Sequence, residues 1–170
     1  MGERKGIIAF RGGPLTLLGT ELKIGDKAPE FTLTDNDMKP FKLGEVSGKT
    51  CIISCVPSLD TPVCDTETRR FNKEAANLPG VVILTVSMDL PFAQKRWCGQ
   101  AGIDKVKTLS DYKDASFGMA YGVLIKELHL LARVVFVVDK AGIIKYIQTV
   151  PEITKEPDYN AVIEAAKKLA

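Results

Sequence analysis

The sequence predicts an α/β fold in which helices cover a mainly parallel sheet. Residues 51–56 and 81–87 are continuous apolar runs, which are typical of strands covered on both faces. Each run is followed by a segment with apolar residues at helical spacing, so strand and helix alternate along the chain. A length of 170 residues suits one domain, over residues 1–170, with its own core.

The first element expected is a β-hairpin over about residues 7–22. Residues 7–10 and 15–22 are largely apolar and flank Arg11-Gly12-Gly13-Pro14, where Gly-Gly can supply the positive φ of a tight turn. Residues 29–43 then carry a short strand and turns.

The alternating region begins with the strand at 51–56 and a helix over 64–78. Phe71, Ala75 and Leu78 share one face of this helix, and Pro79-Gly80 ends it. After the strand at 81–87, the same patterns predict a helix from Pro91 that stops near 99–102, a short strand at 107–109, a helix over 114–121, a hairpin of 133–138 and 143–150, and a closing helix over 157–169. This order is the one expected of a thioredoxin-like fold with an added N-terminal β-hairpin.

Composition excludes several classes of protein. A net charge of +2 and the lack of a basic patch interleaved with aromatic residues argue against nucleic acid as a partner. No apolar run approaches the roughly 20 residues of a membrane span. The short apolar stretch at 7–10 is too small for a signal-peptide core, so we expect a cytoplasmic protein. The four cysteines and His129 lack the paired spacing of a zinc site, and no metal or cofactor is expected.

Cys64 stands where a predicted strand and loop give way to a helix. Thr61 can serve as the N-cap, and Pro62 suits the first helical position. Cys64 then becomes the third helical residue, near unpaired N–H groups and the positive end of the helix dipole, which favour a thiolate. Cys51 and Cys55 lie on one side of a buried strand and are expected to be structural.

The acidic residues of the same turn oppose a thiolate. Asp65 and Glu67 suit the helix dipole but repel a negative sulfur, so a cation from elsewhere is needed. Arg69 and Arg70 are turned away from the helix start, and Arg133, at the head of an apolar strand, is the better candidate. Position alone leaves open that the cysteine is simply a small buried residue.

The stretch Pro57-Ser58-Leu59-Asp60-Thr61-Pro62-Val63-Cys64 resembles the active-site loop of peroxiredoxins, which reads proline, three residues, threonine, two residues, cysteine. This variant is similar to the atypical two-cysteine peroxiredoxins of the bacterial thiol peroxidase branch. Residues 89–99 and 152–159 agree with that resemblance, which covers nearly the whole chain.

The resemblance implies a role for five residues. Cys64 would be the peroxidatic cysteine and Cys98 the resolving one, joined to it in an intramolecular disulfide. Thr61 would hold the peroxide through its hydroxyl, Pro57 would shield the pocket, and Arg133 would be the active-site arginine.

The resemblance also implies an activity. The protein would reduce hydrogen peroxide and organic hydroperoxides, with thioredoxin as reductant, as part of antioxidant defence and as a homodimer. Because a disulfide requires Cα atoms within about 7 Å, local unwinding around both cysteines is expected during turnover. Two alternatives remain at this point: a redox sensor that is oxidised once, and a disulfide oxidoreductase, against which the missing Cys-x-x-Cys motif argues.

Overall fold

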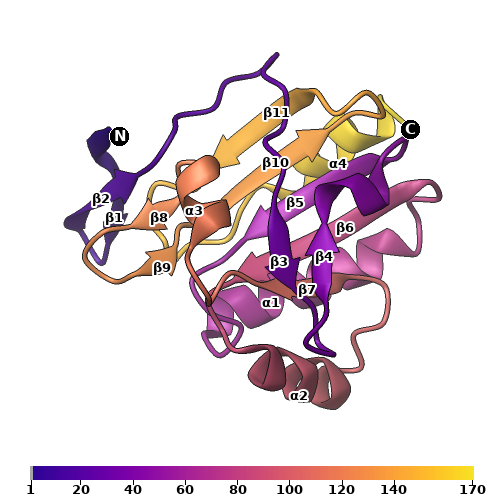
Figure 1. Ribbon diagram of the computed structural model, residues 1–170, viewed down its shortest axis with the longest axis horizontal. Coiled ribbons are helices and arrows are strands. Elements are labelled where there is room, and N and C mark those ends of the chain that lie inside the picture. Colours follow the sequence, from indigo (N-terminus) through magenta and orange to yellow (C-terminus); the bar gives the residue numbers. More distant parts are fainter. Residues whose placement is uncertain (1) are drawn as a thin grey trace.

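The computed structural model describes residues 2–170 and confirms the predicted α/β class (Figure 1). The strands are β1 (Glu3–Phe10), β2 (Gly13–Leu18), β3 (Thr32–Thr34), β4 (Pro40–Lys42), β5 (Thr50–Cys55), β6 (Val81–Ser87), β7 (Lys107–Ser110), β8 (Leu124–Ile125), β9 (Leu130–Leu131), β10 (Val134–Val138) and β11 (Ile144–Thr149). The helices are α1 (Pro62–Ala75), α2 (Pro91–Ala101), α3 (Ser116–Ala120) and α4 (Tyr159–Lys167), with a 3-10 turn, η1, at Leu43–Val46.

Two sheets build the molecule. The larger has seven strands in the order β11-β10-β5-β6-β7-β3-β4, and the smaller has four in the order β1-β2-β8-β9. Strands β5, β6 and β7 are parallel, whereas β10 pairs antiparallel with both β5 and β11. The parallel centre explains the continuous apolar runs, because both faces of these strands are covered.

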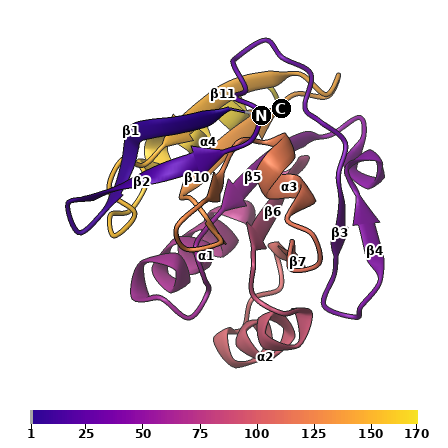
Figure 2. The same cartoon turned by 60° about the vertical axis from the view of Figure 1, so that its left-hand side comes forward.

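Alternate residues of β5 point into two different cores. Ile52 packs with α1 and α4 through residues such as Phe71 and Val162. Cys51 and Ile53 face the opposite side, where α3 and the smaller sheet cover the large one. Figures 1 and 2 show this layering, with α3 on one side of the large sheet and α1 and α4 on the other. The period of two along the strand therefore decides which layer each residue meets.

The N-terminal hairpin is present, but its bounds and its turn differ from the prediction. Phe10 pairs with Gly13, so the turn consists of Arg11 and Gly12, with φ values of 49° and 82°. Positive φ at both positions is the type I′ geometry preferred in two-residue hairpins. The strand β1 starts earlier than predicted because it opens with Glu3-Arg4-Lys5-Gly6, which gives no apolar signal.

The sequence analysis missed the β8–β9 hairpin. Each strand has only two residues, too few for a period of two to be read. The hairpin joins β2 and completes the smaller sheet. His129 lies exposed in its turn with φ of 52°, consistent with the surface role expected of it. Residues 29–43 likewise hold a β3–β4 hairpin rather than one strand.

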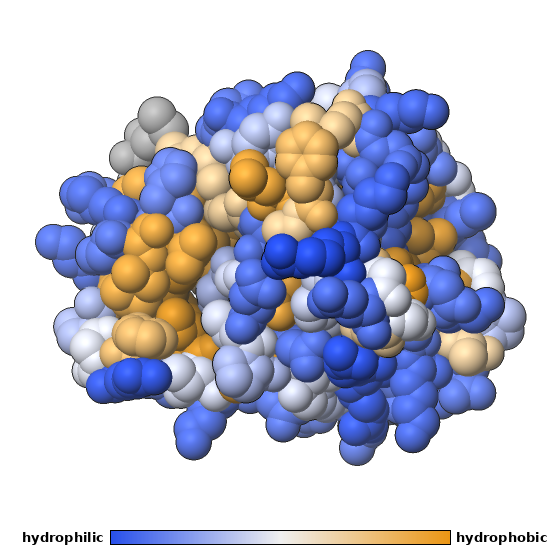
Figure 3. Space-filling view, turned by 90° about the horizontal axis from the view of Figure 1, so that it is seen from below, coloured by the Kyte–Doolittle hydropathy of each residue, from blue (hydrophilic) through white to orange (hydrophobic). Residues whose placement is uncertain are grey.

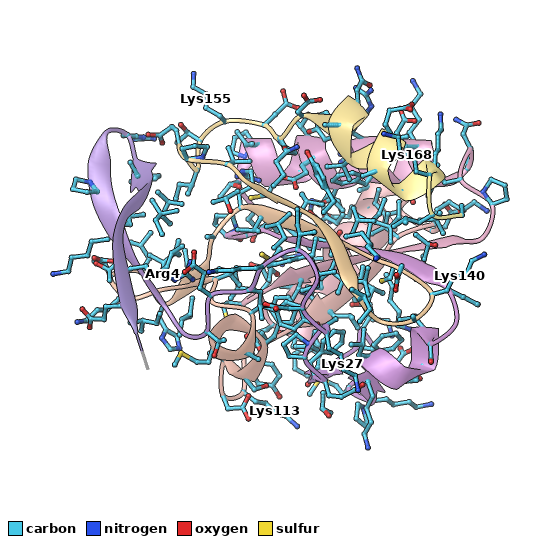
Figure 4. All side chains as sticks on the ribbon, turned by 90° about the horizontal axis from the view of Figure 1, so that it is seen from above. Arg4, Lys27, Lys113, Lys140, Lys155 and Lys168 are labelled. Atoms are coloured by element: carbon cyan, nitrogen blue, oxygen red, sulfur yellow. The ribbon has the colours of Figure 1, made fainter. Side chains whose placement is uncertain are left out.

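Basic side chains are spread over the surface. The lysines labelled in Figure 4 are distributed around the molecule, from Lys155 and Lys168 at one edge of the view to Lys27 and Lys113 at the opposite edge. Within residues 2–170, no helix has the length and apolar character needed to span a membrane.

Candidate active site

The Cys64 thiol lies in the first turn of α1, and the predicted helix start is confirmed. Thr61 is the N-cap, with extended backbone angles, and its Oγ1 accepts from the Cys64 N–H at 3.4 Å. The same hydroxyl donates to the Ser58 carbonyl at 3.0 Å, which holds the loop against the helix. Pro62 occupies the first helical position. Cys64 is fully buried, so any substrate must reach it through a defined opening.

Arg133 is the cation that the first turn of α1 requires. It directly precedes β10, and its Nη2 donates to Cys64 Sγ at 3.3 Å. Its side chain is 1% exposed, and Nε and Nη2 also donate to the Ile153 carbonyl at 3.2 and 2.8 Å. These bonds fix the guanidinium before any substrate binds. The structure therefore brings together the thiol, the helix N-cap and the arginine that the sequence placed far apart.

Glu67 has a role opposite to the one expected from sequence. Its Oε2 accepts from Arg133 Nη1 at 2.6 Å and its Oε1 from Ser54 Oγ at 2.8 Å. Both members of this ion pair are 1% exposed. The carboxylate therefore aims Arg133 at the sulfur rather than acting on the thiolate unopposed. The signal available in the sequence was spacing, since residues three apart on a helix share a face.

Asp65 was also expected to oppose the thiolate, but other groups engage its carboxylate. Its Oδ1 accepts from Arg69 Nε at 3.0 Å and from Trp97 Nε1 at 2.9 Å. The Asp65 carboxylate thus binds the Arg69 guanidinium and Trp97 of α2.

Burial and charge act against each other in the Arg133–Glu67 pair. Burial disfavours the charged guanidinium, but the adjacent Cys64 and Glu67 outweigh it, and the pKa of Arg133 is raised. Burial is also the main influence on Glu67, and it raises the pKa of that carboxyl although Arg133 and Ser54 lower it. The arginine therefore stays charged, and the carboxyl can take up a proton if its partner is lost.

A cavity of about 330 Å³ reaches Arg133, the partner of the Cys64 sulfur. Pro57, Thr61 and Arg133 line it, as do Val63 and Phe10, the last from the N-terminal hairpin. Most of its exposed lining is apolar, and the polar side chains come from Arg133, Thr61, Arg11 and Thr154.

Asp89 anchors the active-site loop and was missed by the sequence analysis. Its carboxylate accepts from Ser58 Oγ at 2.7 Å, from the Leu59 N–H at 2.8 Å and from Ser87 Oγ at 2.7 Å. Asp89 lies between the end of β6 and the start of α2, so one side chain connects the loop before Cys64 to the helix that carries Cys98.

Cys98 is separate from this site. Among the described residues all four cysteines are free, and Cys98 is partly exposed on α2. Its Sγ lies 3.3 Å from Thr108 Oγ1, and it lines a second cavity, of about 380 Å³. Trp97 and Cys64 nevertheless belong to one apolar cluster, against which Cys98 packs.

Cys51 and Cys55 have the environment of structural residues. Both lie in the apolar core beneath α3, as their spacing on one strand predicted. Burial raises the pKa of Cys51 to about 12 and that of Cys55 still further, so both thiols stay protonated at neutral pH. Residues 2–170 contain no cluster of three or more potential metal-ligating side chains.

Comparison with known proteins gives consistent matches. The model of the Redoxin family matches residues 23–163. The chain is 59% identical over 160 residues to a thiol peroxidase of Halalkalibacterium halodurans, covering 94% of this chain and 96% of the relative. It is 57% identical over 162 residues to a thiol peroxidase of Bacillus subtilis, covering 95% and 97%.

A solved structure is similar along nearly its whole length. The peroxiredoxin-like protein from Aquifex aeolicus superimposes with a TM-score of 0.92 at 44% identity, covering 98% of this chain and 99% of that one. The thioredoxin-like architecture predicted from the sequence is therefore confirmed.

Proposed function

Because the chain belongs to the Redoxin family and is a thiol-dependent peroxidase of the peroxiredoxin type, we propose that Cys64 is the sulfur that attacks the peroxide. The observation that carries this assignment is the 3.3 Å contact from Arg133 Nη2 to Cys64 Sγ at a capped helix start. A cation and helix N–H groups both favour a thiolate, which is the nucleophilic form of cysteine.

The first step breaks the O–O bond. The Cys64 thiolate bonds to one peroxide oxygen, and the other oxygen leaves as hydroxide or alkoxide and takes a proton from solvent. Cys64 becomes a sulfenic acid. Negative charge spreads over sulfur and both oxygens, and the fixed donors of Arg133 stabilise it. The Thr61 hydroxyl joins them when its one hydrogen turns from the Ser58 carbonyl to the peroxide. Pro57 shields the recess from water.

Cys98 is proposed to resolve the sulfenic acid. Its sulfur forms the disulfide with Cys64 and water leaves, which also protects Cys64 from further oxidation. Cys98 faces another cavity in the reduced form, so local unwinding of α1 and α2 is needed. Thioredoxin, or a protein of that type, then reduces the disulfide by exchange.

The cavity lining supports organic hydroperoxides as substrates beside hydrogen peroxide. Phe10 and Val63 offer apolar contacts to an alkyl group, while Arg133 and Thr61 meet the peroxide oxygens. Steady-state consumption of hydrogen peroxide and of an alkyl hydroperoxide, each with and without thioredoxin, tests both points.

Cysteine variants test the assignment directly. Cys64→Ser is expected to lose peroxide consumption, whereas Cys98→Ser retains one turnover but no sustained turnover with thioredoxin. A Cys64→Ser protein that consumes peroxide at the native rate would remove the assignment. The likeness to thiol peroxidases favours catalysis over a sensor oxidised once, and sustained turnover separates the two.

The quaternary state and location are further parts of this proposal. Leu90 and Phe92, at the start of α2, are 51% and 66% exposed beside the loop that Asp89 anchors, which supports a homodimer through this face. Figure 3 shows the face seen from below, where apolar side chains form separate patches among hydrophilic ones. Light scattering of native and Phe92→Asp protein tests the dimer.

Four free cysteines suit a reducing compartment, so we place the protein in the cytoplasm, where antioxidant defence needs it. Cell fractionation tests the location. A single domain over residues 1–170 predicts one cooperative unfolding transition.

A further inference from the structure

The Cys98 thiol belongs to a short hydrogen-bond relay. Its Sγ lies 3.3 Å from Thr108 Oγ1, and Thr108 Oγ1 donates to Asn36 Oδ1 at 2.9 Å. A threonine hydroxyl has one hydrogen, and here it points towards Asn36. The contact with Cys98 is therefore one in which the S–H donates and Thr108 accepts. The relay therefore fixes the Cys98 sulfur where it lies on α2.

The relay ties α2 to the edge of the large sheet. Thr108 lies on β7 and is 2% exposed, and Asn36 lies in the turn between β3 and β4. Three segments that are far apart in sequence thus meet at the one side chain of α2 that has to leave its place for a disulfide to form. The neighbouring Trp97 is also held, because its Nε1 donates to Asp65 Oδ1 at 2.9 Å.

We propose that Thr108 and Asn36 are positioning residues that hold the Cys98 thiol in a closed position on α2, so that opening of this relay sets the rate of sulfenic acid resolution. The inference rests on the proposed function of Cys64 and Cys98. When the relay opens, the Cys98 sulfur bonds to the Cys64 sulfur and the S–O bond of the sulfenic acid breaks. The hydroxyl leaves with the thiol proton as water, so atoms and electrons balance.

The relay also explains how two cysteines in one protein keep separate roles. Cys64 accepts from the charged Arg133 and is poised to react with peroxide, whereas the hydrogen-bond partner of the Cys98 thiol is the neutral hydroxyl of Thr108. The longer the relay remains closed, the longer the sulfenic acid is exposed to a second peroxide molecule, which would oxidise it to the sulfinic acid.

The test measures resolution separately from the first step. Reduced protein is mixed with an equimolar amount of hydrogen peroxide, and two signals are followed: fluorescence of Trp97, the single tryptophan, and disulfide formation by rapid-quench mass spectrometry. Thr108→Val removes the acceptor with little change in shape. The disulfide phase is expected to accelerate about two- to tenfold, the effect of one neutral hydrogen bond on an opening equilibrium. In a parallel experiment with excess peroxide, over-oxidation of Cys64 is expected to fall.

Two further variants control for changes in packing. Thr108→Ser keeps the hydroxyl and is expected to restore the native rate to within about twofold. Thr85→Val makes the same chemical change on the neighbouring strand β6, where Thr85 pairs with Thr108 in register and its buried hydroxyl has no partner. Its disulfide phase is expected to be native.

The outcomes distinguish the proposed role of the relay from the proposed roles of Cys64 and Cys98, on which it rests. An unchanged or slower disulfide phase in Thr108→Val, or an equal acceleration in Thr85→Val, would overturn the role of the relay and leave the cysteine assignments intact. If native protein formed no Cys64–Cys98 disulfide, both proposals would fall.

Discussion

Replacing Arg133 by methionine separates its part in catalysis from its part in stability. The substitution removes the donor that lies 3.3 Å from Cys64 Sγ and keeps an unbranched apolar side chain. Two unit charges at that distance interact by about 5 kcal/mol at an effective dielectric constant of about 20. The net worth of a hydrogen bond to a charged group is smaller, about 1.5–3 kcal/mol.

Since each 1.36 kcal/mol is a factor of ten in rate, kcat/KM for peroxide should fall by about ten- to 150-fold. Stopped-flow measurement of Cys64 oxidation in the reduced protein gives this rate without interference from thioredoxin. The reasoning is refuted if the rate of Cys64 oxidation in Arg133→Met stays within about threefold of the native rate, since a threefold loss is well below the smallest loss expected.

Stability should fall for a different reason. Arg133→Met leaves Glu67 buried without its ion-pair partner at 2.6 Å, a loss of about 3–5 kcal/mol for a carboxylate that stays charged. Because burial already raises the pKa of Glu67, protonation limits this loss. The double variant Arg133→Met/Glu67→Gln should recover most of the urea midpoint but none of the peroxide rate. If the double variant recovered both the urea midpoint and the peroxide rate, the rate loss in Arg133→Met would come from a damaged fold.

Three other predictions concern residues around the site and the sheet. Asp89→Ala should lower kcat/KM for peroxide about tenfold, because the loop loses charged hydrogen bonds at Ser58 and Leu59, each worth about 1.5–3 kcal/mol. Asp89→Asn should lower kcat/KM by less, and equal losses in the two variants would contradict this. Burial raises the pKa of Asp111 from 3.8 to about 6, so the contribution of this carboxyl to stability is fullest below pH 4 and falls by about 3 kcal/mol as the pH rises to 6. In urea titrations, the free energy of unfolding of Asp111→Asn should therefore rise relative to that of the native protein between pH 4 and pH 6. A difference that stays constant over this range would refute the assignment. Gly19→Ala should lower the thermal midpoint by several degrees, because Gly19 has φ of 102° and a Cβ would lie 2.2 Å from the Met119 carbonyl oxygen; an unchanged melting curve would contradict it.

Local patterns predicted much of the fold. The apolar runs of β5, β6 and β10 and the helical spacing of α1 and α4 depend on neighbours in sequence, and all were found close to their expected positions. The β8–β9 hairpin was missed because two-residue strands carry no period, and they form only where β2 offers an edge to pair with.

The candidate site also has features that local sequence predicted and features that it did not. The cap at Thr61, the first-turn position of Cys64 and the need for a cation all follow from the sequence, because helix ends have local rules. Glu67 was misjudged because its partner, Arg133, lies 66 residues away and meets it only through pairing of β5 with β10. The anchoring role of Asp89 depends on a contact between the active-site loop and the end of β6, which no local pattern encodes.

The sequence by itself determined the class of fold, the position of the Cys64 thiol at a helix start and, through its resemblance to peroxiredoxins, the chemistry. Tertiary structure decided which charges face that thiol and in which cavity each cysteine lies. The physical reason is the range of the interactions. Backbone capping and periodicity act over a few residues, whereas the strength and direction of a buried ion pair or relay depend on distances that exist only once the sheet has assembled.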